Sequence, residues 1–500
     1  MSGPVGPEEK RGIWVISVIG ATLRKLRDEA FDASVSSDGS QIVFRDAESR
    51  DIWAMGADGQ QAHLVIKPEG GYHVFEPSWL PGAQRIIYGR YQEKNGQANF
   101  VLESRDLKGA DPVILVSDQR FRDYCLAGDG RLLYVLGEPA PNLYDANLWE
   151  LRFDSATGKP KGKPRKLTDW TGFTFDFPKM TTDFKSLAFL NNQNQSDVYV
   201  GELAGDGSEL KPARRLTLDD RLDWPGGWSA DSKTVFFYSD RTRNFDIYKQ
   251  GVNERNAEVL VSDAEEKWAP QASPDGKWVV YLSWAKPAND APITAGTIKR
   301  VPISGGPPEN VMDIKGHPGI VSGGFIGETV GGFPSFRCPQ HAGAPCVLAE
   351  GEDKQITFTA FNPEKGRVNE IAKIPAEVDS MNWDLSPDGT RIALTKFDFK
   401  TGDIQIIPVA GGSTQTISVK GWTQIGWVAW AGDGKSLFVS CFSSRGTSVV
   451  HVSLNGDARP LLKSVWDFTS VYPSPDGHSV ALGPVITNAN AWIIPKLPDR

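Results

Sequence analysis

The sequence predicts an all-β fold built from about ten repeated units, each of four antiparallel strands. Two observations carry this prediction: a short turn sequence returns about every 45 residues, and runs of β-branched and aromatic residues lie between the turns. The composition agrees. The 500 residues include 51 Gly, 34 Pro and 16 Trp but only 5 Met, a mixture typical of tight turns between aromatic-bearing strands. Hydrophobic residues make up 40% of the chain and charged residues 23%, so a globular core is expected.

The repeated turn has the form Ser-Pro-Asp-Gly or a close variant. Its aspartate, or the residue that replaces it, is found at Asp38, Gly82, Asp129, Asp183, Asp231, Asp275, Asp388, Asp433 and Asp476. Pro sets φ at the second position, the Asp side chain caps the backbone, and Gly takes a left-handed conformation, so a type I hairpin turn is predicted. Because 113 residues separate Asp275 from Asp388, a tenth and much altered copy is expected near residue 340.

The same order of strands follows each turn. An apolar strand comes directly after it, as at residues 41–44 and 234–237. A later strand carries a β-branched or aliphatic residue beside an aromatic one: Ile13-Trp14, Ile52-Trp53, Leu148-Trp149, Val198-Tyr199 and Ile247-Tyr248. A basic fourth strand ends the unit, as at Arg24–Leu26, Arg165–Leu167 and Arg214–Leu216. Four antiparallel strands in about 45 residues form the blade of a β-propeller.

Several shorter phrases add a resemblance to a known family. They are Trp224-Pro225 before Trp228-Ser229, Val198–Leu203, Arg445-Gly446, and Phe336–Cys338 followed by Cys346–Leu348. With the turns, they make the units resemble the TolB-type (WD40-like) propeller repeat. Residues 11–495 resemble the propeller region attached to serine/threonine kinases or winged-helix regulators of acidobacteria-like bacteria. The chain departs from that pattern because it has no kinase, DNA-binding module or membrane helix beside the repeats. The resemblance implies a fold but little chemistry.

The repeats can be arranged in one ring or in two. Natural rings hold about 4 to 8 blades, so we favour tandem propellers over a single ring of ten. Residues 1–205 are predicted to form a first propeller that lacks its N-terminal blades, and residues 206–500 a second propeller of six blades. The last set of strands ends at Trp492–Ile494 without a fourth strand, and Arg214–Leu218 is expected to fill that place. Because the strands at 13–26 follow no turn, the chain is expected to begin inside a blade.

Little in the sequence points to catalysis. The Gly-x-Ser-x-Gly sequence of α/β-hydrolases does not occur, and the Gly-Lys-Ser triplet at 434–436 lacks the earlier glycine of a phosphate-binding loop. The six histidines show no spacing typical of metal ligands, and the recurring aspartates belong to turns. We therefore expect no catalytic residue, no metal and no cofactor. The basic run at 159–166 is expected to be a solvated loop, with a phosphate-contacting patch as the alternative.

Tryptophans gather in the connectors that lead from the fourth strand of one unit to the first strand of the next. In a propeller these connectors share one face with the loops between second and third strands. The rings either wedge between blades, as large apolar groups do in cores, or form a binding face with Trp and Arg anchors. The candidate loop-face binding residues are Trp170, Arg221, Trp224, Trp268, Trp422 and Trp466.

The four cysteines are too few for a disulfide framework. Cys338 and Cys346 flank a loop that contains two prolines and one glycine, and a hairpin there would bring them within reach of a disulfide. Two reduced thiols are the alternative.

These observations favour a non-catalytic protein-interaction or sensing module, related to propellers coupled to bacterial signalling domains. The alternative is a propeller enzyme, such as a metal-dependent polysaccharide lyase or hydrolase. A protein partner of unknown identity is expected. Nucleic acid is not expected as a partner because the net charge is −8 and the pI about 5.5. The apolar run at 13–23 is shorter than the ~20 residues of a membrane span and lacks a cleavage site. We therefore expect a cytoplasmic location by default, or one outside the cytoplasm if the parent protein is membrane-anchored.

Overall fold

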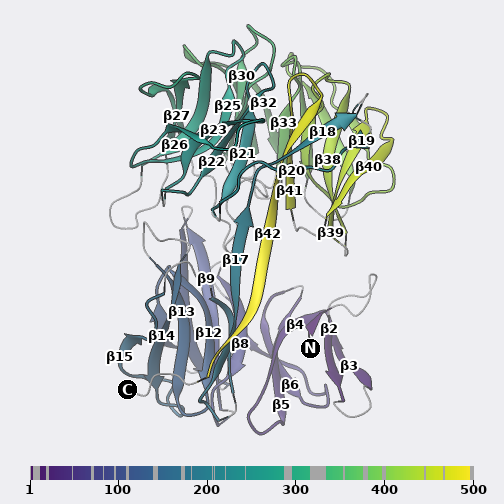
Figure 1. Ribbon diagram of the computed structural model, residues 1–500. Helices are drawn as coiled ribbons and strands as arrows, with labels where there is room; N and C mark the ends of the chain where they lie inside the picture. The colour runs from purple at the N-terminus through teal and green to yellow at the C-terminus, as the bar shows by residue number, and fades with distance from the viewer. Residues whose placement is uncertain are drawn as a thin grey trace. The chain divides into compact units, whose positions relative to one another are not determined.

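The computed structural model consists of β-strands joined by turns and loops (Figure 1). It describes residues 2–3, 12–17 and 22–495, except 48, 69–71, 83, 95–96, 108–111, 139–144, 171–174, 182, 205–206, 208, 220, 243, 286–294, 316–333, 353–354, 376–380, 397–400, 444–445 and 465–467. The described residues contain no helix, and hence none long and apolar enough to cross a membrane. The prediction of an all-β chain of four-stranded antiparallel blades is confirmed.

The chain divides into two compact units. The first contains residues Met1–Gln193 and Ala489–Arg500, and the second contains Asn194–Asn488. This division differs from the predicted boundary at residue 205, because a segment just before 205 belongs to the second unit and the last segment of the chain belongs to the first. The number of rings and the number of blades in each ring stay predictions.

In the second unit, five sheets have strands that pair in chain order. They are formed by β21–β24 (Asp223–Trp228, Thr234–Ser239, Asp246–Gly251, Glu258–Val261), β25–β28 (Glu266–Ala272, Trp278–Trp284, Ala295–Pro302, Glu309–Lys315), β29–β32 (Ser335–Arg337, Cys346–Glu352, Gln355–Asn362, Gly366–Pro375), β33–β36 (Met381–Leu385, Arg391–Lys396, Asp403–Pro408, Gln415–Ser418) and β37–β40 (Ile425–Trp430, Ser436–Ser443, Gly446–Ser453, Ala458–Ser464). Strands β22 and β26 are buried along most of their length, whereas the outer strands β28 and β32 are mostly exposed. Burial on both faces is expected where the faces of neighbouring blades pack together.

A sixth sheet of the second unit joins strands from its two ends in the sequence. Strand β41 (Phe468–Pro473) pairs with β42 (Ser479–Ile494), β42 pairs with β18 (Tyr199–Ala204), and both β19 (Glu209–Leu210) and β20 (Arg214–Arg215) pair with β18. The segment at Arg214 forms an outer strand of this last sheet, as the sequence predicted. The third strand is β18 and not Trp492–Ile494, because β42 continues past this sheet and also pairs with β17.

The first unit is built in the same way from earlier repeats. Its sheets are β1–β3 (Ser2–Gly3, Gly12–Ile16, Leu23–Asp28), β4–β7 (Ala30–Val35, Gln41–Asp46, Ile52–Gly56, His63–Ile66), β8–β11 (His73–Trp79, Arg85–Lys94, Gln97–Asp106, Val113–Ser117), β12–β15 (Phe121–Ala127, Arg131–Gly137, Ala146–Phe153, Pro160–Lys166), and β16 with β17 (Phe175–Met180, Leu187–Ser196) and β42.

The strand expected from Arg165 begins earlier, at Pro160, so the expectation of a loop is wrong for most of the basic run. It forms β15, the outer strand of its sheet, where Arg165 pairs with Glu150 and Pro160 with Phe153. Its side chains are almost all exposed. Prolines are tolerated there because an edge strand does not need every backbone N–H.

The repeated turn has the chemistry that its sequence predicts. In five copies the serine Oγ donates a hydrogen bond of 2.5–2.6 Å to the aspartate two residues later: Ser36, Ser229, Ser273, Ser386 and Ser474. The residue after the aspartate is left-handed, with φ of 73° at Gly39, 74° at Gly389 and 59° at Ser232, which replaces the glycine in one copy. These hydrogen bonds lower the pKa of the turn aspartate, which at Asp38 is about 2.

Candidate binding site

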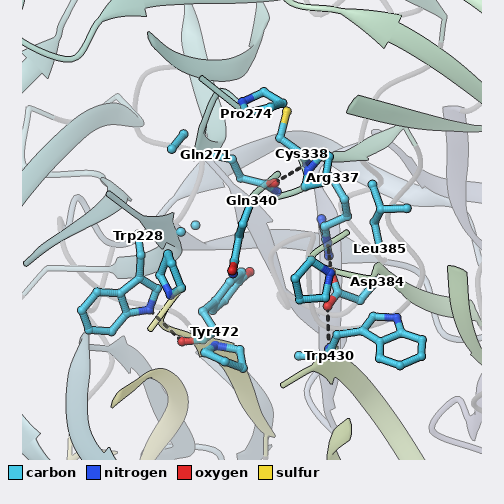
Figure 2. A pocket seen from close by; sticks show the side chains of 18 of the residues that line it. Trp228, Gln271, Pro274, Arg337, Cys338, Gln340, Asp384, Leu385, Trp430 and Tyr472 are labelled. Carbon is cyan, nitrogen blue, oxygen red and sulfur yellow. Dashed lines mark hydrogen bonds and ion pairs between the residues drawn. The ribbon is translucent and has the colours of Figure 1, made fainter. Parts of the chain in front are cut away.

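A cavity of about 140 Å³ lies at the ends of the first strands of six sheets in the second unit. Its lining comes from β21, β25, β29, β33, β37 and β41, and from the turns that follow these strands. Figure 2 shows side chains from these strands around one opening. Ligand sites are usually concave, mostly apolar and furnished with a few polar groups that converge. This cavity is therefore the candidate site.

The two charged side chains of the lining, Arg337 and Asp384, are paired (Figure 2). Arg337 Nε lies 3.3 Å from Asp384 Oδ1, and Arg337 Nη1 donates to the carbonyl oxygen of Phe336 at 2.9 Å. The backbone N–H of Trp430 donates to Asp384 Oδ2 at 2.7 Å. Burial raises the pKa of Asp384 to about 6, although Arg337 and the N–H of Trp430 both lower it. Asp384 therefore takes up a proton, and the cavity wall loses a negative charge, at a higher pH than an exposed aspartate would.

The connection between β29 and β30 forms one wall of the cavity. The Gln271 side chain on β25 ties down the end of β29: its Nε2 donates to the Phe336 carbonyl oxygen at 3.0 Å, and its Oε1 accepts the N–H of Cys338 at 2.9 Å. On the other side, the N–H of Gln340 donates to the carbonyl oxygen of Pro387 at 3.0 Å. Neighbouring sheets thus hold this wall from both sides.

Flat rings surround the charged pair. Trp228 and Tyr472 lie on one side of the cavity and Trp430 on the other (Figure 2). The ring of Trp427 lies 5.9 Å from that of Tyr472, and the Arg337 guanidinium lies 5.9 Å from Trp427. Five prolines complete the lining: Pro274, Pro339, Pro387, Pro473 and Pro475. Such a surface suits a ligand with a planar or apolar part and a polar end.

A different cluster of ionisable groups lies on the first strands of the first unit. Asp123 accepts the N–H of Phe177 at 2.7 Å and the N–H of Tyr124 at 2.6 Å. Burial and the neighbouring charge of Asp123 raise the pKa of Glu76 to about 8, so Glu76 holds its proton to a higher pH than an exposed glutamate does. Arg45 pairs with Asp32 at 2.8 Å. Within the described residues, no group of three or more His, Cys, Asp or Glu side chains is arranged to hold a metal ion.

The predicted loop-face residues do not form one exposed surface in the second unit. Trp224 and Trp268 are buried, with exposed fractions of 5% and 2%, and the Trp268 ring contacts those of Tyr238 and Phe245 at 5.4 and 5.0 Å. Trp422 is half-buried against the core of its own sheets. Burial favours the packing interpretation for these three residues.

The remaining loop-face residues differ from one another. Arg221 is exposed. Trp170, in the first unit, is half-buried, and its ring lies 6.0 Å from that of Phe189. Trp466 lies outside the described residues. A binding role for Arg221 stays a prediction.

Cys338 and Cys346 form a disulfide. Cys338 also lines the cavity, a position that the spacing of the cysteines did not reveal. Cys125 and Cys441 are buried free thiols, and burial raises the pKa of each to about 12.

Comparisons with known proteins agree with the fold and leave the function open. No family model matches the chain. An uncharacterized protein of Agrobacterium fabrum is 25% identical over 227 residues, which cover 40% of this chain and 75% of that protein. An oligogalacturonate lyase from Vibrio parahaemolyticus is similar with a TM-score of 0.36 and 11% identity, over 61% of this chain and 76% of the other. TolB from Acinetobacter baumannii is similar with a TM-score of 0.24 and 16% identity, over 69% and 79%. Similarities this weak carry no argument about a substrate or partner.

Sequence reasoning missed the cavity because its residues lie at the opposite ends of the first strands from the connectors. Trp224 is near the start of β21, whereas Trp228 is at its end. The signal was present, since the cavity residues lie just before the repeated turn. Arg337 and Asp384 stand out there as charged residues in the strands before Cys338 and Ser386.

Proposed function

We propose that the chain is a non-catalytic binding or sensing module and that its ligand enters the cavity of the second unit. One observation carries the proposal. Aromatic, proline and small residues line most of the cavity, and its two charged side chains are bonded to each other and to backbone groups. Side chains held in this way recognise a ligand without having to be reorganised.

We further propose that the ligand is part of a protein partner. Aromatic rings and an arginine at the centre of a site are the residue types that dominate protein-binding hot spots. The resemblance to propellers that are coupled to bacterial signalling domains agrees with such a role, since a sensing domain must bind something before it can transmit.

Blocking the cavity with a large side chain tests this proposal. Gln340 is exposed and lines the cavity, so Gln340→Trp should fill the opening without removing core packing. Lys277→Trp adds the same ring to a neighbouring turn, at an exposed residue that does not itself line the cavity. Tagged wild-type protein and both variants are used to capture proteins from lysate of the source cells. A partner that wild type and Lys277→Trp retain and Gln340→Trp loses supports the proposal; equal recovery by all three contradicts it.

Asp384 favours one alternative function, that of a hydrolase or lyase. A carboxyl group with its pKa raised to about 6 in a cavity is suited to general acid or base catalysis. In that case Asp384→Asn should abolish turnover of a polysaccharide substrate while leaving the thermal unfolding cooperative. If oligosaccharides are cleaved by wild type and not by Asp384→Asn, the enzyme alternative replaces the binding proposal.

A further inference from the structure

The connection between β29 and β30 closes differently from the other turns at the cavity. In the β25–β26 turn, Ser273 bonds to Asp275 at 2.5 Å, and the N–H of Trp278 donates to Ser273 Oγ at 3.1 Å. Arg337 pairs with Val347 in one sheet, and Ala272 pairs with Val279 at the equivalent place in the preceding sheet. Cys338 and Cys346 therefore occupy the positions that Ser273 and Trp278 occupy in the β25–β26 turn. The cysteine pair therefore closes a longer turn that has no Ser-Asp sequence of its own.

This longer turn contacts the cavity and both neighbouring sheets. Cys338, Pro339 and Gln340 line the cavity. The N–H of Cys338 bonds to Gln271 of the preceding sheet, and the N–H of Gln340 bonds to Pro387 of the following turn. The turn also packs closely against Gly389, since a methyl group added there would lie 3.1 Å from the Ala344 side chain and 3.3 Å from Pro339.

We propose that the Cys338–Cys346 disulfide is a redox latch on the wall of the cavity. This inference rests on the proposed function, because the disulfide would control access to the cavity in which the ligand is proposed to bind. In the oxidised chain the disulfide holds the turn against Gln271 and Pro387. In the reduced chain the turn is free to leave both contacts, because hydrogen bonds to its own side chains do not replace the lost cross-link.

Reduction follows ordinary thiol–disulfide exchange with a dithiol. A thiolate of the reductant attacks Cys338 Sγ, which belongs to the half-buried cysteine, and the S–S bond breaks with Cys346 leaving as thiolate. The second thiol of the reductant then displaces Cys338. Both cysteines take up protons, and the reductant, having given two electrons, becomes a disulfide.

Hydrogen exchange of the full chain tests the latch without any ligand. Exchange is measured by mass spectrometry for the oxidised protein, for the protein reduced with a phosphine, and for the double variant Cys338→Ser/Cys346→Ser. We expect exchange at residues 336–346 and 384–390 to become at least tenfold faster in the last two samples. Segments of the first unit such as 124–136 should keep their rates. The matched control Ser273→Ala, which weakens an ordinary turn, should change exchange only around residues 271–280.

Two results would overturn the latch. Unchanged exchange at 384–390 would mean that the disulfide has no hold on the neighbouring turn. Equal acceleration throughout residues 199–482 would mean that the disulfide supports the whole unit and does not control one wall. Because exchange reports on the wall itself, failure of the latch is distinguished from failure of the proposed function, which is measured by capture of a partner.

Discussion

The first strands of the sheets in the two units carry different side chains at the same position of the repeat. Six residues before the turn aspartate or its replacement, the first unit has Asp32, Glu76, Asp123 and Phe177, and the second has Pro225, Ala269, Asn382, Trp427 and Ser470. The turns themselves are alike in both units: Ser36 bonds to Asp38 and Ser474 to Asp476 at 2.6 Å. The repeat thus conserves turn geometry within the chain while the strand interior differs between units.

This difference teaches where to look for function in a repeat protein. A residue that recurs in most copies, such as the turn aspartate, serves folding in those copies. The side chains at this position, six residues before it, which include three carboxyl groups in the first unit and none in the second, do not serve a shared folding role. The cavity with Arg337 and Asp384 belongs to the second unit, and Glu76 and Asp123, whose pKa values are raised by burial, belong to the first.

The largest effect is expected from packing at the end of the strands away from the cavity. Trp268→Ala should lower the free energy of unfolding of the second unit by about 3–5 kcal/mol, as large-to-small core substitutions do, because its ring is buried against Tyr238 and Phe245. Arg221→Ala, an exposed change, should stay within about 0.5 kcal/mol. Denaturant titration measures both. Equal stability of Trp268→Ala and wild type would return Trp268 to the list of binding anchors.

Removing the cross-link should have the next largest effect. Cys338→Ser/Cys346→Ser should lose about 2–3 kcal/mol in the second unit, since the closed loop is short. Alkylation without reductant, followed by intact-mass measurement, should label the two free cysteines and leave Cys338 and Cys346 unlabelled. Labelling of all four cysteines in protein purified without reductant would contradict the disulfide and favour the reduced alternative.

The carboxyl groups of the two units should respond to pH in different windows. The folded pKa of Glu76 is about 8 against an ordinary 4.5, so the folded state binds the extra proton and stability falls as pH rises from about 4.5 to 8. Glu76→Gln keeps the side chain neutral at every pH. Between pH 5 and pH 8 its free energy of unfolding should therefore rise by about 1–2 kcal/mol relative to wild type, less than the full 1.36 kcal/mol per pKa unit.

Asp384 supplies the matched comparison for Glu76. Its pKa is raised from 3.8 to about 6, so its effect on stability is complete by about pH 7. Asp384→Asn should therefore leave the slope of stability against pH unchanged above that value, where Glu76→Gln still flattens it. Chemical denaturation at pH 5, 6, 7 and 8 separates the two. Parallel curves for Glu76→Gln and wild type over the whole range would contradict the buried, protonated state of Glu76.

The smallest effect is expected from two turn glycines of the second unit. Gly389 and Gly477 have φ of 74° and 71°, so alanine at either should cost about 1 kcal/mol from backbone strain. A methyl group at Gly477 meets nothing within 4 Å, whereas one at Gly389 meets Ala344 and Pro339. Gly389→Ala should therefore be the less stable of the two in thermal unfolding. The reverse order would mean that the 338–346 turn does not pack on Gly389.

The sequence predicted the blades well because their signals are local. Turn residues, β-branched runs and the basic fourth strand each act within a few residues of one another. The outer strand of the last sheet, at Arg214, could be predicted from the sequence. The pairing of β18 with β42 could not, because it joins residues more than 270 positions apart, such as Tyr199 and Leu482. Nothing local to either segment encodes that choice.

The cavity could not be predicted for a similar reason. Arg337 and Asp384 are 47 residues apart in the sequence, and only the packing of successive sheets brings them to 3.3 Å. The connector tryptophans were the more visible signal, and at Trp224 and Trp268 they proved to be buried. A tryptophan count cannot distinguish a wedge from an anchor, because both depend on burying a large flat ring.

The central claim is that the cavity of the second unit binds a ligand, and one titration tests it most directly. The partner captured by wild-type protein is titrated calorimetrically into wild type, Gln340→Trp and Lys277→Trp. We predict that Gln340→Trp weakens binding by at least 30-fold, which corresponds to about 2 kcal/mol at a binding hot spot, and that Lys277→Trp matches wild type. Equal dissociation constants for all three proteins, together with a loss of binding in Arg221→Glu, would contradict the claim and move the binding surface to the opposite ends of the strands.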